Sequence, residues 1–147
     1  GMSEELVRVR IRSVEMPSED ASPVVVLEEA SGGGEFSVAV GAAEAGAILL
    51  ELEGIATPRP LTHELMVQIL REQGLTIRRI EIYGLYGADE DGFLARLEYS
   101  KGFRSWIRDV RPSDALALAV ASGAPVFAHR SLLYGASDDW LEEARRA

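Results

Sequence analysis

Apolar residues recur at two different spacings along this sequence, and that mixture constrains the fold more than any other feature. After Val7, apolar residues return at every second position, at Val9 and Ile11, with arginines between them. This alternation is typical of a strand with one buried face. From Ala45 to Leu52 they return at every third or fourth position, which is the spacing of a helix with one buried face. Both patterns in one chain predict an α+β protein.

Glycines mark where the helices end. Gly41 and Gly54 bound the first predicted helix, Gly74 stops the second and Gly123 stops the third, which is apolar nearly all round and therefore predicted to be buried. Gly46, inside the first helix, is expected to cost about 1 kcal/mol relative to Ala and to permit close helix packing. The pattern predicts a mixed or antiparallel sheet with three to four helices. Predicted strands cover residues 7–12, 24–27, 36–40, 75–83, 92–99, 103–109 and 125–128, and predicted helices cover 41–54, 60–74, 111–123 and 138–145.

The chain has 147 residues, and no linker is long enough to divide it. We therefore expect a single domain over residues 2–147, ending in a polar C-terminal helix over 137–147. Gly1 before Met2 has the form of a tag remnant. The longest apolar run, from Ala45 to Leu50, is far too short to cross a bilayer, and no signal peptide is recognisable. These features predict a soluble cytoplasmic protein that does not bind membranes.

Composition excludes several kinds of chemistry. There is no cysteine and there are only two histidines, so a disulfide framework, a thiol nucleophile, a cysteine-held zinc and a three-histidine zinc site within one chain are all excluded. The net charge of −9 repels nucleic acid on average, so nucleic-acid binding requires a local basic patch or a bridging cation. Lys101 is the single lysine, and the other cations are arginines, which hold phosphate and carboxylate in a planar fork.

Two longer motifs each begin with Arg-Pro. Residues from Arg59 read Arg-Pro-Leu-Thr-His-Glu-Leu, and residues from Arg111 read Arg-Pro-Ser-Asp-Ala-Leu-Ala-Leu-Ala, followed by Gly-Ala-Pro-Val-Phe from Gly123. These motifs resemble the bifunctional nuclease domain; residues 22–27 and 40–48 are similar to its N-terminal part, and the resemblance extends over residues 6–134. It implies a nuclease that acts on RNA and DNA, but it implies no set of catalytic residues.

The first motif contains candidate catalytic groups. His63 has the residue type of a general acid or base near neutral pH, and Glu64 could activate water or hold a divalent cation. Arg59 and Thr62, at the start of the same predicted helix, are candidate substrate-binding residues, because a helix N-terminus binds anions. The alternative is structural: Thr62 as the N-cap of the helix and Glu64 as a first-turn acid.

The second motif repeats this arrangement at the next helix start. Arg111 and Ser113 are candidate substrate-binding residues, and Asp114 is a candidate catalytic or metal-binding carboxylate. The alternative is again structural, with Pro112 presetting the first helical residue and Asp114 either reaching back to the cap N–H or forming a salt bridge with Arg111 or Arg59. If both helix starts face one cleft, they form a phosphate site.

A third candidate is a pair of basic strand faces. One carries Arg8, Arg10 and Arg12, and the other carries Arg104 and Arg108 on either side of a tryptophan. Arginine beside an aromatic ring suits a nucleic-acid strand, whereas cross-strand pairing with glutamate is the structural alternative. Arg96 and Glu98 are expected across that hairpin, and the acidic residues 89–91 are expected in a solvated turn.

Two functions follow from these observations. The first is a metal-assisted nuclease that uses Mg²⁺ or Mn²⁺, because oxygen ligands are present and soft ligands are not; no residue set identifies the metal site. The second is a non-catalytic module, a dimer that binds an anionic ligand or a protein partner through the same helix starts. A homo-oligomer, most simply a dimer, is expected to cover the apolar third helix and residues 132–134.

Overall fold

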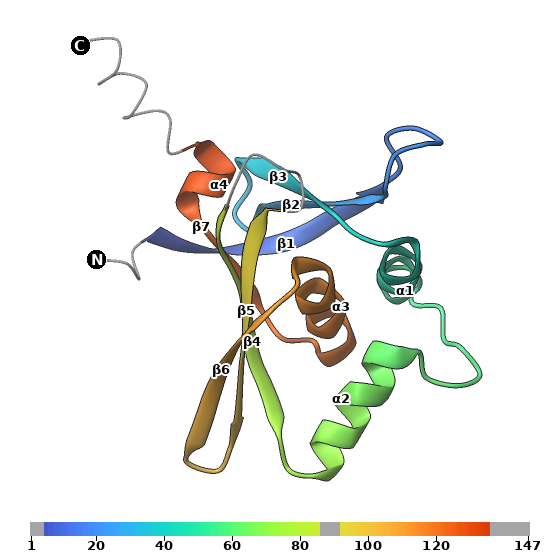
Figure 1. Cartoon of the computed structure of the whole chain (residues 1–147), viewed down its shortest axis with the longest axis vertical. Helices are drawn as coiled ribbons and strands as arrows, with labels where there is room; N and C mark the ends of the chain where they lie inside the picture. Colours follow the sequence, from blue (N-terminus) through green and yellow to red (C-terminus); the bar gives the residue numbers. More distant parts are fainter. Residues whose placement is uncertain (1–4, 86–91, 136–147) are drawn as a thin grey trace.

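Seven strands form one mixed sheet in the order β3-β2-β1-β7-β4-β5-β6 (Figure 1). The structure is a computed structural model that describes residues 5–85 and 92–135. Neighbouring strands are antiparallel except β4 and β7, which run parallel. The strands are β1 (Leu6–Glu15), β2 (Val24–Glu29), β3 (Glu35–Ala39), β4 (Thr76–Leu85), β5 (Phe93–Lys101), β6 (Arg104–Val110) and β7 (Val126–His129).

Three helices cover one face of this sheet, as Figure 1 shows. They are α1 (Ala42–Leu52), α2 (Thr62–Glu72) and α3 (Pro112–Ser122), and a short fourth helix, α4 (Arg130–Tyr134), follows β7. Helix α3 contacts α1, α2, β4 and β5, so residues 115–119 are all buried. Its apolar surface is therefore covered within one chain, and the expectation that a second copy covers it is wrong.

The two faces of the sheet differ in chemistry. The face under the helices is apolar, with Val9, Ile80 and Leu97 buried in one core. The other face carries charged and aromatic side chains, because alternate residues of each strand point to it. On that face Glu81 is directly opposite Arg96 and is only 8% exposed.

The predicted architecture is confirmed up to β7. The fold is α+β, and the predicted elements lie within a few residues of those observed. Helix α4 was not expected, and the predicted helix over 138–145 and the acidic turn at 89–91 lie outside the described residues. The role predicted for Gly46 in close packing is wrong, because it is exposed and a Cβ at this position would meet no atom within 4 Å.

Candidate functional site

The structure brings three of the predicted site residues into direct contact. The two carboxylate oxygens of Asp114 have different partners: His63 Nε2 lies 3.1 Å from Oδ1, and Arg111 Nε donates to Oδ2 at 2.8 Å. His63 and Asp114 are separated by 51 residues in the sequence. We call His63, Asp114 and Arg111 the triad.

Helix packing explains why these residues meet. His63 is the second residue of α2 and Asp114 is the third of α3, so the contact joins the first turns of two helices that pack against each other. Pro112 occupies the first helical position of α3, which its fixed φ favours, and Arg111 is the N-cap residue. Both helix starts therefore direct their positive dipole ends toward this region.

The charge state of Asp114 follows from its neighbours. Burial raises the pKa of the Asp114 carboxyl, but hydrogen bonds from Arg111 and His63 outweigh that effect and hold the pKa below its ordinary value. An ionised carboxylate only accepts hydrogen bonds, so His63 Nε2 carries a proton and donates it. In the neutral ring, Nδ1 then holds the lone pair that can accept a proton.

Exposure differs across the triad. The side chains of His63 and Asp114 are 19% and 28% exposed, whereas that of Arg111 is 72% exposed. Arg111 gives only its Nε–H to Asp114, and its two amino groups have no hydrogen-bond partner in the described segments. The triad therefore combines a partly buried acid–base pair with an arginine fork that is open to solvent.

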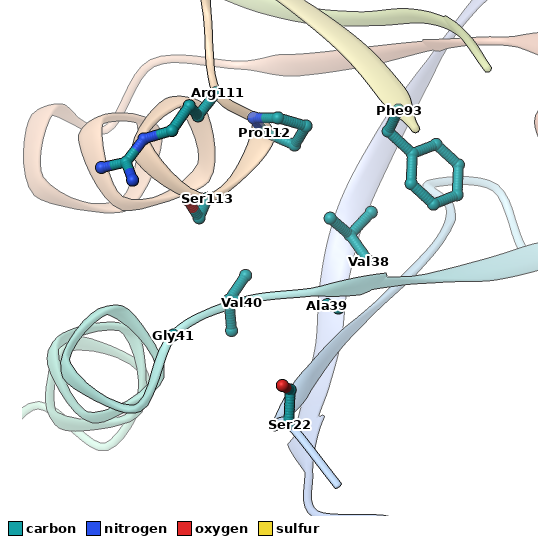
Figure 2. A pocket seen from close by; sticks show the side chains of 9 residues that line it. All are labelled: Ser22, Val38, Ala39, Val40, Gly41, Phe93, Arg111, Pro112 and Ser113. Carbon is teal, nitrogen blue, oxygen red and sulfur yellow. The ribbon is translucent and has the colours of Figure 1, made fainter. Parts of the chain in front are cut away.

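A cavity of about 360 Å³ lies beside the triad, between the starts of α1 and α3 (Figure 2). Arg111 and Ser113 line it from α3, and Gly41 lines it at the start of α1. Figure 2 shows Ser113 directed toward Gly41, with Phe93 on the apolar side. Two helix N-termini, a hydroxyl group and an arginine favour an anionic ligand here.

The other candidates of the first motif do not belong to the triad. Glu64 lines a crevice on the side of α1 and of the connector around Pro58, together with Glu51, and it shares a smaller pocket with His63. Arg59 and Thr62 are exposed. Within the part of the chain that the structure describes, neither side chain makes a hydrogen bond or ion pair with the triad.

Both capping alternatives differ from what is observed. Leu61, not Thr62, is the N-cap residue of α2, and it makes no side-chain cap; Thr62 is the first helical residue. Asp114 does not cap α3, because its carboxylate is taken by the side chains of His63 and Arg111. The hydrogen bond between His63 and Asp114 joins two helices, which a simple cap would not do.

The donor groups do not fit a resident metal ion. Among residues 5–85 and 92–135, no group of three or more His, Asp or Glu side chains is arranged to hold one. Both oxygens of Asp114 are already hydrogen-bonded. The use of Mg²⁺ or Mn²⁺ therefore stays a prediction from the sequence, and the function proposed below contains no step through a metal.

The two basic strand faces differ in their ion pairs and lie on opposite sides of the sheet. Arg10 pairs with Glu28 at 2.8 Å and Arg12 pairs with Glu35, so the cross-strand alternative holds for β1. The register places Arg8 and Arg10 on the open face, whereas Arg104 and Arg108 lie on the helix-bearing face. The two sets therefore form no common surface.

A network on the open face was missed by sequence reasoning. Glu81 pairs with Arg96 at 2.6 Å and also with Arg79, whose guanidinium lies 5.0 Å from the ring centre of Phe127. Arg96 and Glu98 lie on β5 across the hairpin from β6, as expected, and Glu98 is also near Arg79. The signal available in the sequence was Glu81, an acidic residue between Ile80 and Ile82.

The fold is that of a single-domain α+β protein. Its candidate site combines an imidazole–carboxylate contact with an exposed arginine at the starts of two helices. The family model of the bifunctional nuclease domain matches residues 25–139, and the chain belongs to that family. The resemblance seen in the sequence is thereby confirmed.

Relatives in two strains of Mycobacterium tuberculosis, CDC 1551 / Oshkosh and H37Rv, match nearly the whole chain. Each is 32% identical over 143 residues, which cover 95% of this chain and 84% of the relative, and each is called an uncharacterized protein. In the described segments, no helix is long and apolar enough to span a membrane.

Proposed function

We propose that this protein is a nuclease that hydrolyses phosphodiester bonds in RNA or DNA at the triad. The observation that carries the proposal is the hydrogen-bonded contact of His63, Asp114 and Arg111 across two helix starts, beside a cavity suited to an anion. Membership of the bifunctional nuclease domain family supports the same reaction class.

Each member of the triad has a distinct role in this proposal. The free amino groups of Arg111 bind the phosphate and stabilise the charge that develops on its oxygens. His63 accepts a proton through Nδ1 from a water whose oxygen bonds to phosphorus. The bond from phosphorus to the leaving oxygen breaks, and that oxygen takes up a proton from solvent. Asp114 is a positioning residue: it fixes the tautomer of His63 and holds the Arg111 fork in place.

Cleavage of labelled single-stranded RNA and DNA tests the proposal. We expect the wild-type protein to cleave at least one of them, and His63→Ala to lower the rate at least about 10²-fold, which is the usual scale for an acid–base group. Asp109→Asn is a matched control for changes at Asp114, since Asp109 lies on β6 and accepts from Tyr83 on the open face. Equal rates for wild type and His63→Ala would contradict the assignment.

Metal use is tested in the same assay. Reactions with Mg²⁺, with Mn²⁺ and with excess EDTA show whether a cation is required, as the sequence predicts. Glu64→Gln separately tests the predicted catalytic role of Glu64, which lines one crevice with Glu51 and a smaller one with Glu51 and His63. If EDTA abolishes cleavage and the Glu64→Gln variant is also inactive, the metal ion acts at a crevice that Glu64 lines rather than at the triad.

The second candidate function is a non-catalytic dimer that binds an anionic ligand. The observation in its favour is that Arg111 is largely exposed at a helix start, which suffices for anion binding without turnover. Binding of an oligonucleotide without cleavage, under every metal condition, would favour this module over the nuclease.

A further inference from the structure

The hairpin of β5 and β6 concentrates positive charge on a chain whose net charge is −9. Lys101, Arg104 and Arg108 form no ion pair in the part of the chain that the structure describes, whereas four arginines of β1, β4 and β5 are paired with glutamates: Arg10, Arg12, Arg79 and Arg96. Lys101 and Arg104 are directly opposite each other in the ladder. Like charges at such a position destabilise a sheet, so the fold alone does not account for the pair.

Aromatic rings accompany these cations. Trp106 stacks on Tyr99 with ring centres 5.3 Å apart, and the guanidinium of Arg104 lies 5.1 Å from the ring centre of Trp106. At the tip, Phe103 has a relative exposure of 110%, so its ring makes essentially no contact with the protein. Gly102, with φ of +59°, precedes it in the turn, as in two-residue hairpin turns that place glycine first.

Strand β6 connects this hairpin to the triad. It runs from Arg104 at the tip to Val110, and the next residue is Arg111 (Figure 1). Trp106 and Arg108 lie on the same face of the sheet as the helices, because they are opposite Tyr99 and the buried Leu97. At about 3.4 Å per residue, the path from Arg104 to Arg111 is roughly 24 Å, which suits several nucleotides.

We propose that this hairpin surface, formed by Lys101, Phe103, Arg104, Trp106 and Arg108, binds single-stranded nucleic acid and leads it to the triad. Lys101, Arg104 and Arg108 contact backbone phosphates, and a base stacks on the ring of Phe103. The inference rests on the proposed function, because it names the substrate form that the triad acts on.

The charges favour this occupant over a second copy of the chain. A two-fold contact through the hairpin would bring three cations of one copy against the same three of the other, and like charges repel. A polyanion instead relieves the repulsion between Lys101 and Arg104. The exposed aromatic ring accounts for a preference for unpaired bases, whose faces are free to stack.

Fluorescence anisotropy with labelled U12 and dT12 tests the inference, with all proteins carrying His63→Ala so that the strand stays intact. Phe103→Ala should weaken binding about 5- to 150-fold, since stacking of one base contributes on that scale. The double variant Arg104→Ala, Arg108→Ala should make the negative slope of log affinity against log salt shallower by about 1.4, or roughly 0.7 per arginine. Thermal melting should stay unchanged for Phe103→Ala, because its ring is fully exposed.

Arg10→Ala is the matched control, because Arg10 is paired with Glu28 on the opposite face and should leave the affinity unchanged. Suppose that the wild type cleaves and the His63→Ala parent binds, but neither Phe103→Ala nor the double arginine change alters the affinity. This result overturns the hairpin inference and leaves the nuclease proposal intact. Loss of binding in those variants, with a wild type that never cleaves, supports the hairpin and contradicts the nuclease. A parent protein that binds neither oligonucleotide overturns both.

Discussion

At the residue scale, Asp114 is the side chain on which the site depends. It is the acceptor for both an imidazole and a guanidinium, and it links α2 to α3. The sequence predicted all three triad residues as candidates, because their types and their positions at helix starts are visible in the motifs. The Arg111–Asp114 ion pair was foreseen as one alternative, but the contact of His63 with Asp114 was not predictable, since these residues are 51 positions apart and meet only through helix packing. Arg59 illustrates the same limit, because an identical Arg-Pro start gives it no hydrogen bond to Asp114 in the described residues.

Glu81 leads to a prediction about acid stability. Burial raises the pKa of the Glu81 carboxyl, but hydrogen bonds from Arg96 and Arg79 outweigh this and hold it below the ordinary value of 4.5. The stabilisation is therefore fully present above about pH 4.5 and is lost as the pH falls through the lower folded pKa. We expect Glu81→Gln to lower the free energy of unfolding by about 1.5–3 kcal/mol at pH 7 and to reduce its acid dependence.

Urea unfolding at pH 7 and pH 3 measures this effect. Glu98→Gln is the control, because Glu98 is 36% exposed and its contact with Arg79 is long, at 3.8 Å. Exposed pairs of this kind contribute about 1 kcal/mol or less. Equal losses for the two variants at pH 7 would show that burial does not strengthen the Glu81 network.

At the element scale, the periodic segments were predictable and the helix ends were less so. Helix α3 is buried as its composition indicated, with residues 115–119 inaccessible. Its residue type predicts Thr62 as the N-cap of α2. In the structure Leu61 is the N-cap residue and Thr62 is already the first helical residue. Helix α4 has only five residues, too few for periodicity, and its start is held by the His129 ring accepting from the N–H of Ser131.

Replacing glycine by alanine should change the stability of the protein in opposite directions at two positions. Gly123 ends α3 with φ of +77°, so Gly123→Ala should cost about 1–2 kcal/mol through backbone strain alone. Gly46 lies inside α1 with open space around its Cβ position, so Gly46→Ala should stabilise the protein by about 0.5–1 kcal/mol. Thermal or urea unfolding of the two variants measures both, and a shift of the same sign in each would refute the backbone argument.

At the scale of the whole molecule, sheet order was the least predictable property. Strand β7 lies between β1 and β4 in the sheet and pairs parallel with β4. In the sequence, β5, β6 and α3 separate these two strands. Such a crossover joins strands far apart in the sequence, and no local pattern specifies it. Three helices on one face nevertheless follow from the apolar stripes, because each stripe must be buried against the sheet.

The expected homo-oligomer now rests on different residues. Six of the ten large hydrophobic side chains that are exposed in the described segments lie between residues 49 and 69, on α1, α2 and their connector. They are Leu49, Leu52, Ile55, Leu65, Met66 and Ile69. We predict a dimer at tens of micromolar by light scattering, and dissociation on Met66→Glu or Ile69→Glu. A monomeric wild type would rule it out.

The most direct test of the central claim is a double-mutant cycle on the rate of strand cleavage, with His63→Ala, Asp114→Asn and the two combined. Residues that act as one unit give strongly non-additive losses. We predict that each single change lowers kcat at least about 10²-fold and that the combination is no slower than the worse single variant. Losses that multiply, or activity unchanged by either substitution while Asp109→Asn behaves like wild type, would contradict the role of Asp114 in positioning the catalytic His63.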